Sequence, residues 1–168
     1  MHVDGVGTKL ILDVTVPGLP IPKARPRVGR NPETGAVNTY TPTKSKDWEN
    51  RITGYLLAAR APKLPKTIPL LLELEIVRNE GSSSEPQWDV DRPDVDNIVK
   101  SVMDALAPSK KSKGAWVRVL QDDAQISATL VWKRTLAPSE MPFVRFRLHE
   151  LLTPPSPWGK SSSSLGAE

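Results

Sequence analysis

The stretch Pro93–Leu106, with the sequence PDVDNIVKSVMDAL, carries the strongest secondary-structure signal in the chain. Its apolar residues recur with the period of an amphipathic helix, at Val95, Ile98, Val99, Val102, Met103 and Leu106. The first turn of a helix tolerates a proline, so Pro93 is compatible with a helix start. The stretch therefore predicts a helix over 93–106 that packs one face against a hydrophobic core.

Strands are predicted on both sides of this helix. Before it, apolar and polar residues alternate over Leu10–Val16, and Leu70–Val77 is strongly apolar. After it, Trp116–Leu120 and Gln125–Trp132 are apolar stretches separated by an acidic turn, and Phe143–His149 alternates again. The first strand would place four apolar side chains on one face, those of Leu10, Leu12, Val14 and Val16.

A second helix is predicted from Pro42 and Thr43 to about Arg60. Its apolar stripe would consist of Trp48, Ile52, Tyr55, Leu56 and Ala59. Strands mixed with two helices predict a single α+β domain over about Leu10–Leu151, a small mixed β-sheet with two main helices packed on it. Residues 1–9 would be an N-terminal tail, and the Pro- and Ser-rich residues 152–168 a disordered C-terminal tail.

Composition narrows the class of protein. A chain of 168 residues, 38% hydrophobic and 25% charged, fits one ordinary globular domain. No apolar run is long enough to span a membrane and the first residues do not resemble a secretory signal, so we expect a cytoplasmic protein. Cysteine is absent, which excludes disulfides and thiolate metal sites.

Basic residues are concentrated in one segment. Between Pro20 and Arg60 the chain has eight Lys and Arg and three Asp and Glu, an excess of five (8 − 3), against a net charge of +4 overall. Such a concentration suggests a polyanionic partner, although a solvated charged surface would also explain it. The candidate phosphate contacts are Lys23, Arg25, Arg27 and Arg30.

Two acidic elements are candidates for chemistry. Asp94 and Asp96 lie at the start of the predicted helix, where helix capping and the helix dipole alone could explain them. Asp96, Lys100 and Asp104 follow at a spacing of four and form one polar stripe, which could equally be a surface salt bridge.

The second acidic element is the pair Asp122 and Asp123, which by itself is typical turn chemistry. A hard divalent cation, however, takes oxygen ligands from separate segments, and only His2 and His149 could offer imidazole to a zinc ion. Carboxylates beside basic residues suit metal-assisted phosphodiester hydrolysis. Lys100 could stabilise charge on the phosphate or orient the attacking water.

Together these residues resemble the RusA-like Holliday junction resolvases. The resemblance covers roughly Val14–Lys133. It rests on RPDVDNIVK at 92–100, MDAL at 103–106, LQDDAQI at 120–126, PKARPR at 22–27 and TYTP at 39–42.

The resemblance implies a site and an activity. It implies metal-ligand roles for Asp94, Asp96 and Asp123, and a catalytic role for Lys100. It further implies a structural or metal-supporting role for Asn97 and Asp122. The implied protein is a homodimer that uses Mg²⁺ or Mn²⁺ to make paired symmetric nicks across a four-way DNA junction in recombination and repair.

Two alternatives stay open from the sequence. One is a non-catalytic DNA-binding protein whose aspartates only cap a helix and a turn. The other is a nuclease of the same chemistry that acts on other branched DNA. The basic trio Lys110, Lys111 and Lys113 could be a DNA clamp or a solvated loop, and Trp88 could stack on a base.

Overall fold

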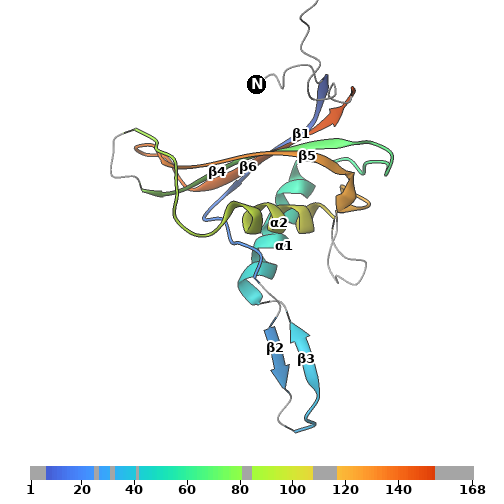
Figure 1. Cartoon of the computed structure of the whole chain (residues 1–168), viewed down its shortest axis with the longest axis vertical. Helices are drawn as coiled ribbons and strands as arrows, with labels where there is room; N and C mark the ends of the chain where they lie inside the picture. Colours follow the sequence, from blue (N-terminus) through green and yellow to red (C-terminus); the bar gives the residue numbers. More distant parts are fainter. Residues whose placement is uncertain are drawn as a thin grey trace, which may run out of the picture.

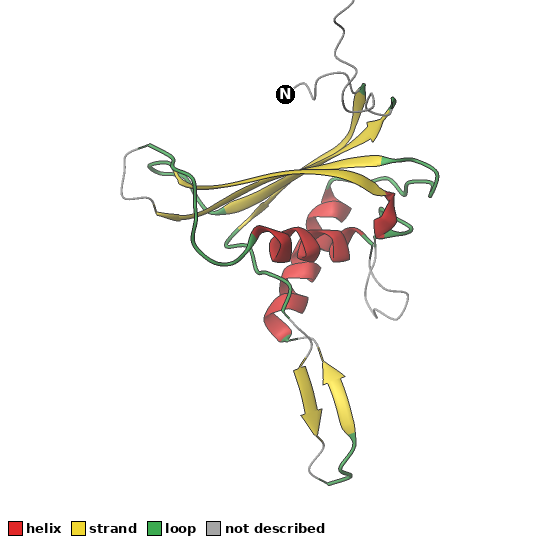
Figure 2. Ribbon diagram, viewed as in Figure 1, coloured by secondary structure: helices red, strands yellow, loops and turns green. Residues whose placement is uncertain are grey.

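A computed structural model of the chain describes residues 7–24, 27–30, 33–40, 42–80, 85–107 and 117–153. Its body is a mixed four-stranded sheet in the order β1-β6-β4-β5, with both helices on one face (Figures 1 and 2). The strands are β1 (Thr8–Pro17), β4 (Leu70–Glu80), β5 (Ile126–Leu136) and β6 (Phe143–Leu151). The predicted class, α+β with a small mixed sheet and two helices, is confirmed.

Strand β6 is antiparallel to both of its neighbours, whereas β4 and β5 are parallel. A parallel pair needs a crossover connection, and helix α2 (Val95–Leu106) supplies it across the helix-covered face. Helix α1 (Thr43–Ala58) lies on the same face and packs against α2 and β1. No helix in the described part of the chain is long and apolar enough to cross a membrane.

The predicted alternation of buried and exposed residues in β1 and β6 is nearly complete. Leu12, Val14 and Val16 of β1 are buried, and so are the alternate apolar residues of β6. Leu10 was predicted on the same face, but its side chain is 53% exposed. The reason is a register irregularity between Leu10 and Leu12, which turns Leu10 away from the core.

The opposite face of the sheet is lined by cross-strand ion pairs. Asp13 on β1 contacts Arg145 and Arg147 on β6 at 2.6 and 3.1 Å. Arg147 and His149 in turn contact Glu73 on β4 at 2.7 and 2.9 Å. Opposite charges across neighbouring strands stabilise their pairing and register, so this face is held by charge while the other is held by apolar packing.

Helix α1 confirms the predicted second helix with a narrower apolar stripe. Trp48, Ile52 and Leu56 are buried, whereas Tyr55 and Ala59 are exposed. Before α1, the short strands β2 (Arg27–Arg30) and β3 (Val37–Tyr40) form an antiparallel hairpin that projects from the body below α1 (Figure 1).

Helix α2 begins at Val95, two residues later than predicted, because Asp94 is the extended N-cap residue and Pro93 precedes it. The segment before the helix is fastened to the sheet. The ammonium group of Lys133 on β5 donates to the carbonyl oxygens of Asp91 and Pro93. Asp89, which is buried, accepts the backbone N–H of Asp91 and pairs with Arg78 on β4 at 2.8 Å.

The predicted strand at Trp116–Leu120 is wrong over its described part, Val117–Leu120. The N–H groups of Val119 and Leu120 both donate to the carbonyl of Leu106, at 3.1 and 3.0 Å. The carbonyl of Val119 accepts from the N–H of Leu64. The segment buries apolar side chains as a strand would, but its backbone closes the end of α2 and does not join the sheet.

The carboxylate of Glu140 stabilises the turn between β5 and β6. Its carboxylate accepts two hydrogen bonds from Arg134, at 2.7 and 2.8 Å, and one from the N–H of Ala137. The hydrogen bonds from Arg134 lower the pKa of Glu140 to about 2. This stabilisation is therefore complete above the ordinary pKa of about 4.5 and is lost as pH falls toward 2.

We expect Glu140→Gln to lower the free energy of unfolding at pH 7 by about 1 kcal/mol, as measured by urea denaturation. The difference from wild type should shrink between pH 4.5 and 2. Glu150→Gln is the control, because Glu150 makes no ion pair within the described residues. A constant difference across that pH range would contradict the assigned role of Glu140.

Candidate functional site

Helix α2 has one buried and one polar face. Ile98, Val102 and Leu106 are fully buried. Opposite them lie Asp96, which is exposed, and Lys100 and Asp104, as the spacing predicted. At the helix start, Asp94 occupies the N-cap position, but its side chain makes no capping hydrogen bond. Capping therefore does not account for the carboxylate of Asp94.

Asp96 and Asn97 lie side by side in the first turn of α2. The side-chain amide of Asn97 donates to the Asp96 carboxylate at 3.4 Å. The carbonyl of Asn97 accepts the backbone N–H of Lys23 at 2.8 Å. Asn97 thus connects the start of the helix to the irregular segment that follows β1.

The second acidic element has two carboxylates with different contacts. The Asp122 side chain accepts the N–H of Ala124 at 3.1 Å and caps a 3₁₀ turn, Asp123–Gln125, at the entrance to β5. The Gln125 side chain completes the capping box by accepting the N–H of Gln121 and Asp122. Asp123 takes no part in this cap and points toward α2.

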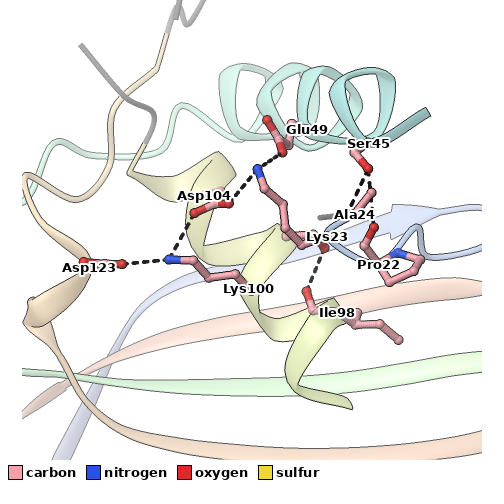
Figure 3. A network of polar contacts seen from close by, with 10 residues as sticks. Pro22, Lys23, Ala24, Ser45, Glu49, Ile98, Lys100, Asp104 and Asp123 are labelled. Atoms are coloured by element: carbon pink, nitrogen blue, oxygen red, sulfur yellow. Dashed lines mark hydrogen bonds and ion pairs between the residues drawn. The ribbon is translucent and has the colours of Figure 1, made fainter. Parts of the chain in front are cut away.

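Lys100 connects Asp123 to Asp104 on the polar face of α2. Its ammonium nitrogen lies 2.9 Å from Asp123 and 3.2 Å from Asp104. Figure 3 shows the Lys100 side chain between the two carboxylates. The hydrogen bond to Asp123 is the main reason why the pKa of Lys100 is raised, and the same bond lowers the pKa of Asp123. At neutral pH, Lys100 is therefore a cation and Asp123 an anion.

Lys23 extends this chain of ion pairs. Its ammonium nitrogen lies 2.7 Å from Asp104 and 2.7 Å from Glu49 of α1. Burial lowers the pKa of Lys23, but the hydrogen bonds to Asp104 and Glu49 outweigh that effect and leave the pKa above its ordinary value. The side chain is 26% exposed and engaged by two carboxylates, a setting that differs from the free phosphate contact predicted for it.

The donor set suits a hard divalent cation, since Asp94, Asp96 and Asp123 are exposed carboxylates. Their arrangement is incomplete. Among the described residues, no three His, Cys, Asp or Glu side chains are grouped so that they could hold a metal ion. Asp123 is instead engaged by Lys100. The structure therefore brings Asp123 to the polar face of α2, and it does not gather the three predicted ligands.

Two of the other predicted DNA contacts, Arg27 and Arg30, are the first and last residues of β2. Arg30 is exposed and its guanidinium donates to the carbonyl of Gly35 at 3.3 Å. The side chain of Arg27 and all of Arg25 lie outside the described part, as do Lys110, Lys111 and Lys113. Trp88 has a side chain that is 75% exposed, so base stacking stays a prediction.

A basic hollow beside the second acidic element was missed by the sequence interpretation. It has a volume of about 380 Å³ and is lined by Lys63, Lys66, Arg118, Gln121 and Asp122. Its cations come from two segments far apart in the chain, with Lys63 and Lys66 in the proline-rich connection before β4. No spacing in the sequence indicated that they would meet.

Comparison with known proteins identifies the family. The model of the family endodeoxyribonuclease RusA matches residues 17–139, which is most of the described chain. The chain belongs to the RusA family. The matched range contains α2, Lys100 and the Asp122–Asp123 pair, so the resemblance stated from the sequence is confirmed. RusA proteins are nucleases that act on branched DNA and generally depend on a divalent metal. No curated protein matches the chain.

The different contacts of the two neighbouring aspartates can be separated by stability. We expect Asp122→Ala to lower the free energy of unfolding by about 1 kcal/mol, because the 3₁₀ turn loses its cap. Asp123→Ala should cost less than about 0.5 kcal/mol, because it removes only an exposed ion pair. Urea denaturation of both variants at pH 7 measures the difference, and equal losses would contradict a capping role confined to Asp122.

Proposed function

We propose that this chain is a divalent-metal-dependent endodeoxyribonuclease that resolves four-way DNA junctions by paired, symmetric nicks. The observation that carries the proposal is the contact of Lys100 with Asp123, which puts the second acidic element against the polar face of α2 in a RusA family chain. Carboxylates that could bind a divalent metal, next to a cation that could stabilise negative charge, suit the hydrolysis of a phosphodiester.

Asp94, Asp96 and Asp123 would hold the metal, for which Mg²⁺ or Mn²⁺ is the match to an all-oxygen donor set. The ion would activate a water molecule, polarise the phosphoryl oxygen and stabilise the leaving alkoxide. Asn97 orients Asp96 through its side-chain amide, and Asp122 fixes the turn that carries Asp123. Lys100 places a positive charge where negative charge develops on the phosphate.

The two nicks of a resolvase lie on opposing strands, so the proposed function includes a homodimer with one site in each copy. Sedimentation equilibrium should then give twice the chain mass of 18.5 kDa. Phosphate contacts are assigned to the arginines of the hairpin segment, Arg25, Arg27 and Arg30, and to the basic hollow.

Cleavage of a synthetic four-way junction tests the activity. Wild type should make paired nicks with Mg²⁺ or Mn²⁺ and none with EDTA. Asp96→Asn should lower the rate by at least about 10³-fold, while junction binding is retained or tightened because a negative charge near the phosphates is removed. Asp94→Asn and Asp123→Asn should behave in the same way.

A matched linear duplex and a splayed-arm substrate serve as controls in this assay. Equal cutting of the splayed arm would point to a nuclease of the same chemistry with broader branch specificity. Tight junction binding without cutting in either metal would support the non-catalytic alternative and contradict the proposal.

The basic hollow leads to a separate prediction about the salt dependence of DNA binding. Three cations and one carboxylate line it, and phosphate contacts release counterions. We expect Lys63→Ala and Lys66→Ala each to reduce the slope of log K against log salt by about 1, as measured by fluorescence anisotropy on the junction. Lys9→Ala, an exposed lysine on β1, is the matched control. Unchanged slopes in both hollow variants would exclude the hollow from the DNA interface.

A further inference from the structure

Lys100 competes with a bound metal for the negative charge of Asp123. The ammonium nitrogen lies 2.9 Å from the carboxylate oxygen of Asp123. A divalent cation bound to the same carboxylate would repel an ammonium group at that distance. A metal on Asp123 therefore weakens the contact of Lys100 with this carboxylate and favours another acceptor for the ammonium group.

A second acceptor for Lys100 is already in place. Asp104 lies one helical turn further along α2, and its Oδ1 atom is 3.2 Å from the Lys100 nitrogen. Lys100 shares its charge between Asp123 and Asp104, so leaving Asp123 breaks one contact and keeps the other (Figure 3). The flexible four-carbon stem of lysine permits such a shift without movement of the helix.

Asp104 is itself fixed from its other side. Its Oδ2 atom is 2.7 Å from the ammonium nitrogen of Lys23, so each carboxylate oxygen has a different cation. Lys23 is held by Glu49 of α1 and by its own backbone bond to Asn97. The side chain of Asp104 is only 25% exposed. Because the Asp104 side chain is already ordered by Lys23, it loses little conformational entropy when it becomes the only carboxylate partner of the Lys100 ammonium group.

We infer that Asp104, held by Lys23, is a positioning residue that receives Lys100 when a divalent cation binds Asp123. The inference rests on the proposed function. It assigns Lys100 two positions, one shared with Asp123 and one on Asp104 alone, beside the metal and the phosphate. Lys23 acts here through Asp104 and not by touching DNA.

The test is a double-mutant cycle with Mn²⁺ affinity as its readout, measured by the electron paramagnetic resonance signal of free Mn²⁺ at pH 7. Asp104→Asn should weaken Mn²⁺ binding by about fivefold, because Lys100 is left with Asp123 as its only carboxylate partner. Lys100→Met should tighten it, because the competing cation is gone. In the Lys100→Met background, Asp104→Asn should change the affinity by less than about twofold.

Two further variants separate positioning from structure and from simple charge. Asp104→Glu keeps a carboxylate that can reach both lysines and should retain wild-type affinity within about twofold. Asp13→Asn removes a similarly exposed, doubly ion-paired carboxylate on the opposite face of the sheet, and should leave the affinity unchanged. The junction cleavage rate should follow Mn²⁺ affinity in the Asp104 variants.

The outcomes distinguish this inference from the proposed function. A loss from Asp104→Asn that persists undiminished in the Lys100→Met background would show a structural or purely electrostatic effect and overturn the inference. So would wild-type affinity in Asp104→Asn. In either case a wild-type chain that binds Mn²⁺ and cuts junctions would leave the proposed function standing. A wild-type chain that neither binds Mn²⁺ nor cuts would overturn both.

Discussion

The parallel pairing of β4 with β5 dictates the path of the chain through the site. Parallel neighbours cannot be joined by a tight turn, so the chain must leave β4, cross the face of the sheet and return to the start of β5. Helix α2 makes that crossing. The return brings Asp122 and Asp123 at the entrance to β5 beside a helix that begins 27 residues earlier (122 − 95). Asp123 thus reaches Lys100 on the polar face of α2 through topology and not through closeness in sequence.

Two adjacent aspartates at the entrance to β5 have different structural roles. Asp122 and Asp123 are chemically identical, yet one closes a turn and the other faces Lys100. The difference comes from the 3₁₀ turn, because the cap position directs one carboxylate back to the backbone and leaves the next one outward. The orientation of the Asp123 carboxylate toward Lys100 therefore depends on the backbone conformation of a single 3₁₀ turn.

Lys23 shows what charge composition can predict about a basic residue and what it cannot. The excess of basic residues between Pro20 and Arg60 pointed to a polyanionic partner, and Lys23 was among the predicted contacts. In the fold its ammonium lies between Glu49 and Asp104, from two different helices. Residue type and local charge density could be taken from the sequence, but the identity of the nearest opposite charge could not.

The class of fold and the family could be predicted from the sequence, and the site residues proposed from it. Alternation fixed the buried faces of β1 and β6, the 3.6-residue period fixed α2, and the ordered aspartate motifs fixed the RusA resemblance. Each of these signals is contained in one or a few short segments of the chain. The packing of the elements, by contrast, is the reason why Val117–Leu120 closes the end of α2 and forms no strand, and why Lys63 and Lys66 meet Arg118. It is also the reason why Lys100 bridges Asp104 and Asp123. Each of these depends on which distant groups are available to satisfy a backbone hydrogen bond or a charge, and that is set by how the elements pack.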